Sequence, residues 1–428
     1  MKRVSLSRVL VASLLLGGAS FVGAVEVSPD DANIQYTGRI DYSDKKAPAM
    51  SWAGTSIRIK FTGTSVKAKL KMPGDGKNKQ FFYAIVNGDD QNGKVITCKS
   101  GEATHVLASG LSEGTHDLLL YKRTDGGPTP VSFLGFELDD GASLKTPDPR
   151  PGIRMEVFGD SISTGLGSDR KRGGEHSGEA TDNYMSYGSI TARNLGAEFH
   201  CISKSGIGLM KSWWPTIMPQ YYDRLSATSL EGSGEAWDFS KWTPHLVIVN
   251  VFQNDSWTRK GTTKKEATEA YVTFLKKIRG HYPKAKIVGV LGSMDASKSQ
   301  GGKWRQAVEG AVKQMNDAGD KEVFSYMFKK QTGHRHPNRG DHIAMSKELT
   351  AFIKTIGEIK PDPPKPVKAA YPAPTAKEKQ MREYMVSAQK NYAAGKMTKE
   401  KFNAGLKKIA AAVPGTKTAD EAKSLMVD

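Results

Sequence analysis

Four short polar segments of this chain carry residue types that together could transfer an acyl group. They are Gly159-Asp160-Ser161, Ser205-Gly206, Asn254-Asp255 and His336-Pro337-Asn338. A serine hydroxyl is a weak nucleophile until a base accepts its proton and hydrogen-bond donors hold the oxyanion that forms. Ser161 is the candidate nucleophile, and the later segments offer candidates for both of the other tasks.

The first segment predicts a tight turn at the end of a buried strand. The run Met155-Glu156-Val157-Phe158 is strand-like, and Gly159 can take backbone angles that are closed to other residues, so the chain can bend sharply there. Such a turn would hold Ser161 at the carboxyl end of a strand, which is where open α/β sheets bind their ligands.

Serine, glycine, asparagine and histidine at the ends of four strands form the pattern of the SGNH, or GDSL, hydrolases, and the chain resembles that superfamily. Its N-terminal half also resembles the jelly-roll of carbohydrate esterase family 2, in Tyr36-Thr37-Gly38-Arg39-Ile40, Phe61-Thr62-Gly63-Thr64-Ser65 and Gly114-Thr115-His116. This resemblance covers most of residues 34–360. It implies a carboxylic ester hydrolase that removes O-acetyl groups from a polysaccharide.

The resemblance also implies a role for each of the four side chains. Ser161 would attack the acyl carbonyl and His336 would accept the serine proton. The oxyanion would be bound by the backbone N–H groups of Ser161 and Gly206 and by the side-chain amide of Asn254. Polysaccharide O-acyltransfer and non-catalytic glycan binding stay open as alternative functions.

Two positions depart from the family pattern. A glycine usually stands shortly before the oxyanion asparagine, but Phe252-Gln253-Asn254-Asp255 contains none. The acid that orients the catalytic histidine usually precedes it by two or three residues, yet residues 331–335 contain no Asp or Glu. We therefore expect a backbone carbonyl to orient His336 in a Ser–His dyad. Asp341 is a weaker candidate acid, because it follows His336 at the start of the last predicted helix.

The neighbouring histidines and tryptophans allow other readings. His334, His336 and His342 lie within nine residues, but a zinc site needs three or four converging ligands, and we expect no metal and no cofactor. Trp257 follows the Asn254 segment and is expected to contact the sugar, since a flat ring buries the apolar face of a pyranose. Trp213 and Trp214 follow the Gly206 segment, and substrate contact and core packing are equally expected for them.

The pattern along the chain predicts an N-terminal all-β sandwich of the jelly-roll type, followed by an α/β SGNH-hydrolase domain with a parallel sheet. Short alternating strands with Gly and Asp turns indicate the sandwich, and apolar runs between helical segments indicate the parallel sheet. The expected divisions are 1–24 signal peptide, 25–147 sandwich, 152–360 catalytic domain, 361–374 Pro-rich linker and 375–428 basic tail, helical or partly disordered.

The N-terminal segment indicates where in the cell the protein is located. Lys2, Arg3 and Arg8 precede a short apolar run that ends in Val22-Gly23-Ala24, a pattern typical of a signal peptide, so we expect a periplasmic or secreted protein cleaved near Ala24. No later segment is apolar enough to span a membrane. Cys98 and Cys201 are expected to be two buried thiols rather than a disulfide.

The net charge of +17 suits an acetylated and possibly anionic polysaccharide partner. Nucleic acid is not expected, because no binding motif occurs. The segment 361–428 carries 13 Lys or Arg and 7 Asp or Glu, so its net charge is +6. This tail could bind an envelope component or a partner protein.

Overall fold

The computed structural model describes residues 23–74, 79–125, 129–228, 235–363, 376–414 and 416–426. The predicted signal peptide therefore lies outside the described residues except for residues 23–24, and the predicted linker except for residues 361–363. Within the described ranges, no helix combines the length and the apolar composition needed to cross a bilayer.

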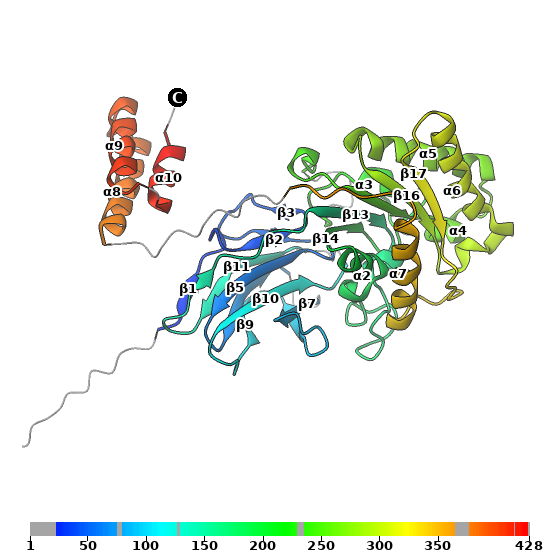
Figure 1. Ribbon diagram of the computed structural model, residues 1–428, viewed down its shortest axis with the longest axis horizontal. Coiled ribbons are helices and arrows are strands. Elements are labelled where there is room, and N and C mark those ends of the chain that lie inside the picture. The colour runs from blue at the N-terminus through cyan, green and yellow to red at the C-terminus, as the bar shows by residue number, and fades with distance from the viewer. Residues whose placement is uncertain are drawn as a thin grey trace, which may run out of the picture.

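The N-terminal region is a sandwich of two antiparallel sheets (Figure 1). The order of the first sheet is β3 (Ile40–Asp41), β4 (Ala49–Met50), β11 (Val131–Leu138), β6 (Val66–Met72) and β9 (Gly101–Ala108), with β1 (Val25–Val27) beside β11. The order of the second is β12 (Leu144–Lys145), β5 (Ser56–Thr62), β10 (Thr115–Lys122), β7 (Lys79–Val86) and β8 (Lys94–Lys99), with β2 (Gln35–Thr37) beside β5. Alternate residues point inward: Val66, Ala68 and Leu70 of β6 are fully buried between the sheets.

The second region is a five-stranded parallel sheet. Its order is β14 (Ala197–Ser203), β13 (Ile153–Gly159), β15 (Leu246–Asn250), β16 (Lys286–Leu291) and β17 (Val323–Met327). The sequence order along the sheet is thus 2-1-3-4-5, and it reverses between β13 and β15. In open α/β sheets, that switch point is where ligands bind, outside the carboxyl ends of the strands.

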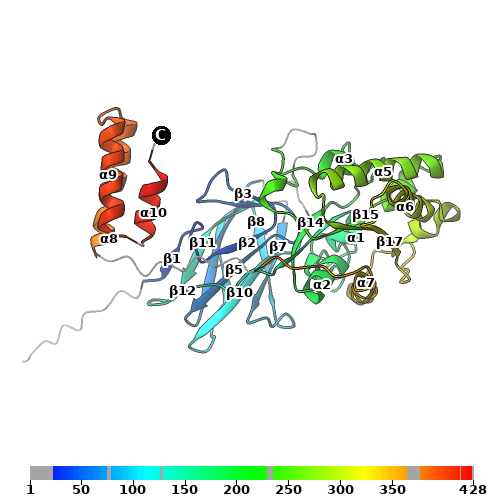
Figure 2. The ribbon, with the colours of Figure 1, turned by 45° about the horizontal axis from the view of Figure 1, so that its top comes forward.

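Helices cover both faces of the parallel sheet, as the predicted α/β class requires (Figure 2). On one face lie α2 (Tyr187–Asn194) and α7 (Arg339–Ile353), and on the other lie α5 (Lys264–His281) and α6 (Ser299–Asp317). Shorter helical segments are α1 (Ser161–Thr164), α3 (Met218–Tyr221) and α4 (Gln253–Thr258), with 3-10 turns at Asn183–Met185, Phe239–Lys241 and Asp295–Ser297. All five residues of β15 are buried, as the apolar run of its first four residues predicts.

The sandwich and the parallel-sheet region share a buried interface. Trp52 of the sandwich packs into the core of the parallel-sheet region, and its indole Nε1 donates to Leu225 O at 2.8 Å. Arg39 is buried as well, and its guanidinium lies 3.0 Å from the carboxylate of Glu156 in the middle of β13. A buried charge that loses its partner is strongly destabilising, so this ion pair ties the two regions together.

The described part of the tail is helical. It forms α8 (Ala376–Ala393), α9 (Lys399–Ala412) and α10 (Lys417–Ser424), whose apolar side chains form a small core of their own, including Met385, Phe402, Leu406 and Ala419. The sequence left a helical and a partly disordered tail as alternatives, because a helical tail had little apolar surface to bury. The unpredicted α10 supplies the missing apolar surface. The partner of this tail stays a prediction.

Cys98 and Cys201 are free and buried, so the prediction of two buried thiols is confirmed. Burial raises the pKa of the Cys98 thiol to about 11 and that of Cys201 to about 12. Neither thiol is therefore suited to act as a nucleophile near neutral pH.

Candidate active site

The Gly-Asp-Ser segment lies at the switch point of the parallel sheet. β13 ends at Gly159, and Ser161 is the first residue of α1, where its side chain is buried. Asp160 is the N-cap of this helix, and its Oδ1 accepts a hydrogen bond from Ile162 N at 3.0 Å. Burial raises the pKa of Asp160 to about 7. Asp160 therefore fixes the turn that presents Ser161.

The predicted reason for Gly159 is wrong. Its φ does not lie in the left-handed region that favours glycine. The position instead needs glycine for space, because a Cβ there would overlap the Ser163 hydroxyl at the next turn of the chain. Close packing of helix against strand, rather than a special backbone angle, fixes this residue.

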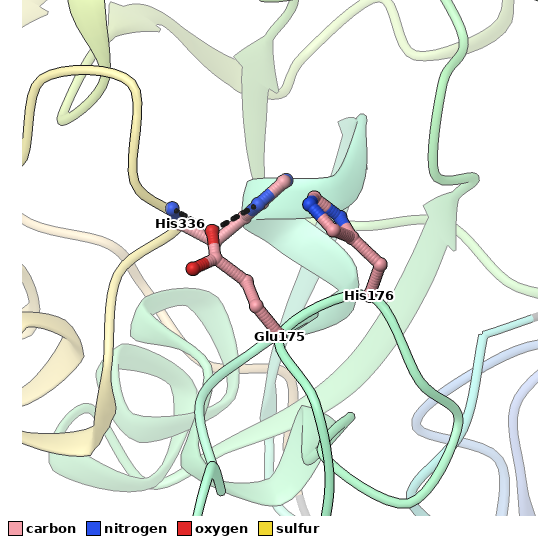
Figure 3. A group of neighbouring side chains, drawn as sticks. All are labelled: Glu175, His176 and His336. Carbon is pink, nitrogen blue, oxygen red and sulfur yellow. Dashed lines mark hydrogen bonds and ion pairs between the residues drawn. The ribbon is translucent and has the colours of Figure 1, made fainter.

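Ser161, His336 and Glu175 form a continuous hydrogen-bonded row. The Oγ atom of Ser161 lies 2.9 Å from Nε2 of His336. On the other side of the ring, Nδ1 of His336 lies 3.0 Å from Oε1 of Glu175. Figure 3 shows this contact as a dashed line. The same carboxylate oxygen accepts the backbone N–H of His336 at 2.7 Å. Glu175 thus fixes both the ring and the main chain of this histidine.

Glu175 is held in turn by Arg170. The guanidinium lies 3.1 Å from Oε2 of Glu175 and also donates to the carbonyl oxygen of His336 at 2.5 Å. Burial works against ionisation of Glu175, but the hydrogen bonds from His336 and the charge of Arg170 outweigh it, so the pKa of Glu175 is lowered. Burial also lowers the pKa of His336, although Glu175 opposes that shift. Both shifts favour a neutral imidazole beside a carboxylate at neutral pH.

The expectation that a backbone carbonyl orients His336 is wrong, because the Glu175 carboxylate occupies that place. Sequence reasoning missed Glu175 since it looked for an acid just before the histidine, whereas Glu175 lies 161 positions earlier. The only local signal was an acidic residue in a Gly-rich loop after the nucleophile. Asp341, the other candidate acid, instead accepts from Asn338 N at 3.0 Å in a capping box of α7 and pairs with Lys330.

The Ser205-Gly206 loop passes close to the nucleophile. Ser205 Oγ lies 3.2 Å from the Thr164 hydroxyl of α1. Ser205 N donates to Asp125 Oδ2 at 2.8 Å, so a residue just after β10 of the sandwich holds this loop. Gly206 has a φ of +84°, which favours glycine, and none of the described residues accepts a hydrogen bond from its N–H. That donor is available to a ligand.

Asn254 lies in the first turn of α4 and is buried. Its Nδ2 donates to Ile207 O at 2.8 Å, which fixes the amide against the Gly206 loop. Asp255, the next residue, accepts hydrogen bonds through its carboxylate from three successive backbone N–H groups of that loop: those of Leu209 at 2.8 Å, Met210 at 2.7 Å and Lys211 at 2.9 Å. The Asn-Asp pair therefore positions the second loop of the site.

Phe252 explains how the loop forms without the expected glycine. Its φ is +87°, in the left-handed region that a glycine would favour and that is unusual for an aromatic residue. A residue held there costs on the order of 1–3 kcal/mol. The ring is fully buried and packs against Tyr271 and Trp304 at centroid distances of 5.3 and 5.0 Å. Burying an aromatic side chain contributes roughly 1.5–3 kcal/mol, which offsets the backbone strain.

The predicted sugar contacts divide into two kinds. Trp257 is half-buried, packs against a core cluster of the parallel-sheet region, and donates through Nε1 to Asp295 at 3.1 Å. Trp213 and Trp214 are 62% and 43% exposed beside the Gly206 loop. The Nε1 atom of Trp214 donates to Ser205 O at 2.7 Å. The two exposed rings therefore have the surface that a sugar could cover.

Of the three clustered histidines, only His336 contacts Ser161. His334 is 85% exposed and pairs through Nδ1 with Asp295 at 3.1 Å. His342 is buried in α7, where its Nδ1 accepts Tyr187 N at 3.1 Å and burial lowers its pKa to about 3. His334 and His342 thus have separate surroundings.

A cavity elsewhere in the molecule is not part of this site. It is lined by Arg154, His200 and Trp242, among others, at the amino half of the parallel strands and beside the sandwich. Ser161 follows the carboxyl end of β13, so the cavity lies at the opposite end of the sheet.

Comparison with known proteins supports this architecture. The family model described as carbohydrate esterase 2 N-terminal matches residues 36–147, which cover most of the sandwich. Cellulase/esterase CelE of Acetivibrio thermocellus is 35% identical over 342 residues, or 76% of this chain. The match spans only 40% of the length of that relative. An acetylxylan esterase / glucomannan deacetylase of Cellvibrio japonicus is 24% identical over 71% of this chain and 84% of its own length.

A solved structure extends the likeness across both regions. The family two carbohydrate esterase from Clostridium thermocellum, in complex with cellohexaose, superposes with a TM-score of 0.67 and 32% identity. The alignment covers 75% of this chain and 98% of that protein. Because nearly the whole of that relative is matched at this identity, the chain belongs to carbohydrate esterase family 2.

Proposed function

We propose that this protein is an exported esterase that removes O-acetyl groups from a polysaccharide, with Ser161, His336 and Glu175 as its catalytic triad. The row of hydrogen bonds from Ser161 Oγ through the imidazole to the Glu175 carboxylate is the observation that carries the proposal. Membership of the family and the names of the relatives, which include an acetylxylan esterase, support the substrate class.

In the first half of the reaction, Ser161 Oγ attacks the acetyl carbonyl. The neutral imidazole that donates Nδ1–H to Glu175 has its lone pair on Nε2, directed to the serine hydroxyl, so His336 accepts the proton as the bond forms. The resulting imidazolium lies against an ionised carboxylate, which stabilises its charge. His336 then gives the proton to the sugar oxygen, which leaves as an alcohol, and the acetyl group stays on Ser161.

The second half releases acetate. A water molecule takes the place of the sugar, and His336 accepts its proton as the oxygen attacks the acetyl-serine. Collapse of the second tetrahedral intermediate returns the proton to Ser161 Oγ and frees acetate. The lowered pKa of His336 keeps the imidazole unprotonated and able to act as a base at neutral pH.

The oxyanion of both intermediates would be bound by the N–H groups of Ser161 and Gly206 and by the amide of Asn254. Gly206 offers an unoccupied N–H, and Asn254 is fixed by Ile207 while its second amide hydrogen is left for the substrate. Each such donor contributes roughly 3–4 kcal/mol to the transition state in comparable hydrolases. The exposed rings of Trp213 and Trp214 would then cover the sugar that carries the ester.

Gly206→Ala should lower kcat by about 10- to 100-fold, because the methyl group disturbs the oxyanion loop. A Cβ at this position would lie 2.8 Å from Trp214 Nε1, which would have to leave its hydrogen bond to Ser205 O. Gly196→Ala is the matched control, since Gly196 also has a positive φ but open space around it. Steady-state kinetics should show little change in the control, and equal losses in both variants would contradict the oxyanion role.

The proposed function is tested by measuring acetate released from acetylated xylan, acetylated glucomannan and an acetylated acidic glycan. An esterase releases acetate in water alone. Release or transfer only when an acceptor alcohol is added would indicate an acyltransferase, and binding without release would indicate a glycan-binding protein. The order of rates across the panel identifies the preferred polymer.

Export is supported by the basic and apolar pattern of residues 2–24. N-terminal sequencing of the protein from the exported fraction should begin near Val25. Recovery of the chain with Met1 intact from the cell interior would contradict this part of the proposal.

A further inference from the structure

A second constellation overlaps the triad. Glu175, His176 and His336 each offer a ligand atom, and these atoms all lie within 4.8 Å of one another (Figure 3). Two imidazoles and one carboxylate are a donor set that zinc binds in proteins. The proposed hydrolysis uses Glu175 and His336 but gives His176 no role.

The position of His176 would allow its ring to bind a ligand. It is exposed, and no hydrogen bond or ion pair engages its ring among the described residues. Its ring lies edge-on to that of His336, with a centroid distance of 5.3 Å and an interplanar angle of 85°. Figure 3 shows the two rings approaching each other above the Glu175 side chain. An imidazole lone pair is therefore available beside the catalytic base.

We propose that Glu175, His176 and His336 form an inhibitory site for a divalent cation of the zinc type. In a tetrahedral zinc site with bonds of 2.0–2.1 Å, ligand atoms lie about 3.3 Å apart. Glu175 Oε1 and His336 Nδ1 are already 3.0 Å apart, and the wider separations must shorten by up to about 1.5 Å. Glu175 and His176 are neighbours in one loop between α1 and the 3-10 turn at Asn183–Met185, so a small shift of that loop would move both ligands together.

Binding of the cation is incompatible with catalysis. A metal on Nε2 of His336 takes the lone pair that must accept the Ser161 proton. A metal on Nδ1 replaces the proton that is donated to Glu175 and removes the orienting hydrogen bond. Either bond removes a contact that hydrolysis needs. The metal is thus an inhibitor here, and chelators should relieve inhibition without inactivating the enzyme.

The test compares zinc and magnesium on protein that carries no histidine tag. Isothermal titration calorimetry of the Ser161→Ala variant measures zinc binding without any turnover, so it stands even if the substrate proposal fails. Acetate release is then measured against zinc concentration for wild type, His176→Ala and His334→Ala, each relative to its own metal-free rate. His334 is the matched control, because it is a nearby exposed histidine outside the constellation.

We expect one zinc per chain, inhibition reversed by EDTA, and a half-inhibiting zinc concentration at least about tenfold higher for His176→Ala but unchanged for His334→Ala. Magnesium, which prefers an all-oxygen site, should not inhibit at these concentrations. Equal sensitivity of His176→Ala and wild type would overturn the proposal, as would loss of zinc inhibition in His334→Ala. Loss of activity in EDTA that zinc restores would also overturn it, since the metal would then be required.

Discussion

Replacing Ser161 with alanine should lower acetate release by roughly 10⁵-fold or more, because removal of the nucleophile from a triad costs about as much as removal of the whole triad. The fold should be retained. Only one oxygen atom is lost, and its hydrogen bond to His336 is the contact that disappears. Initial rates on acetylated xylan and the melting temperature, measured on the same preparation, check both parts of this expectation.

Ser163→Ala is the matched control for this variant. Ser163 is also buried in α1, two residues away, but its hydroxyl lies 2.9 Å from the Tyr187 hydroxyl rather than beside the histidine. This variant should keep most of its turnover. Near-normal esterase activity in Ser161→Ala would sink the mechanism, and a large loss in Ser163→Ala at unchanged stability would place the essential hydroxyl elsewhere.

The second large effect is expected at Glu175. Glu175→Gln keeps the size of the side chain but removes the charge that stabilises the imidazolium and selects the tautomer. In a serine protease, the corresponding change of the acid to its amide lowers kcat about 10⁴-fold. We expect a loss of roughly 10²–10⁴-fold here, because Glu175 is a quarter exposed and water can partly replace it.

Asp341→Asn is the control for Glu175→Gln, since Asp341 is the acid nearest in sequence and caps α7 instead of contacting the ring. It should lower the free energy of unfolding by up to about 2 kcal/mol, because the cap and its ion pairs are weakened, and so lower the melting temperature. It should leave kcat nearly unchanged. His336→Ala should be far more damaging to turnover than this variant. A large loss of kcat in Asp341→Asn at unchanged melting temperature would assign the orienting role to Asp341.

The pH dependence of kcat/KM tests whether Glu175 is charged beside His336. His336 acts as a base only when neutral, so kcat/KM should rise with pH through its pKa, which lies below the ordinary value of 6.5. Glu175 raises that pKa, so Glu175→Gln should move the acidic limb to lower pH as well as reducing the plateau. If the acidic limb of Glu175→Gln lay at the same pH as that of the wild type, Glu175 would carry no charge beside the His336 ring.

The sequence predicted the sandwich, the parallel sheet and most of the helices, because period-2 alternation and unbroken apolar runs report burial directly. It placed Asp341 at the start of the last helix, and α7 begins two residues earlier, at Arg339. The structure adds that Asn338 is the N-cap, in a capping box with Asp341 three residues later. The sequence pattern missed β17, whose residues are mostly half-buried and carry a weak apolar signal.

At the site, local motifs found Ser161 and His336, which the structure brings into hydrogen-bonding contact. Glu175 could not be found in the same way, because its partner is 161 positions away and only folding brings them together. Phe252 shows that the absence of an expected residue need not change the backbone. A family pattern called for glycine, and the backbone takes the glycine-like conformation anyway, since buried aromatic packing outweighs local preference.

The Asp125 contact makes the sandwich more than a neighbour of the catalytic region. The sandwich supplies the carboxylate that holds Ser205 N, the indole of Trp52 inside the other core, and the cation that neutralises Glu156. Separation of the two would leave an anion uncompensated in the interior and the oxyanion loop without its anchor. We therefore expect the two regions to unfold together, in a single cooperative transition.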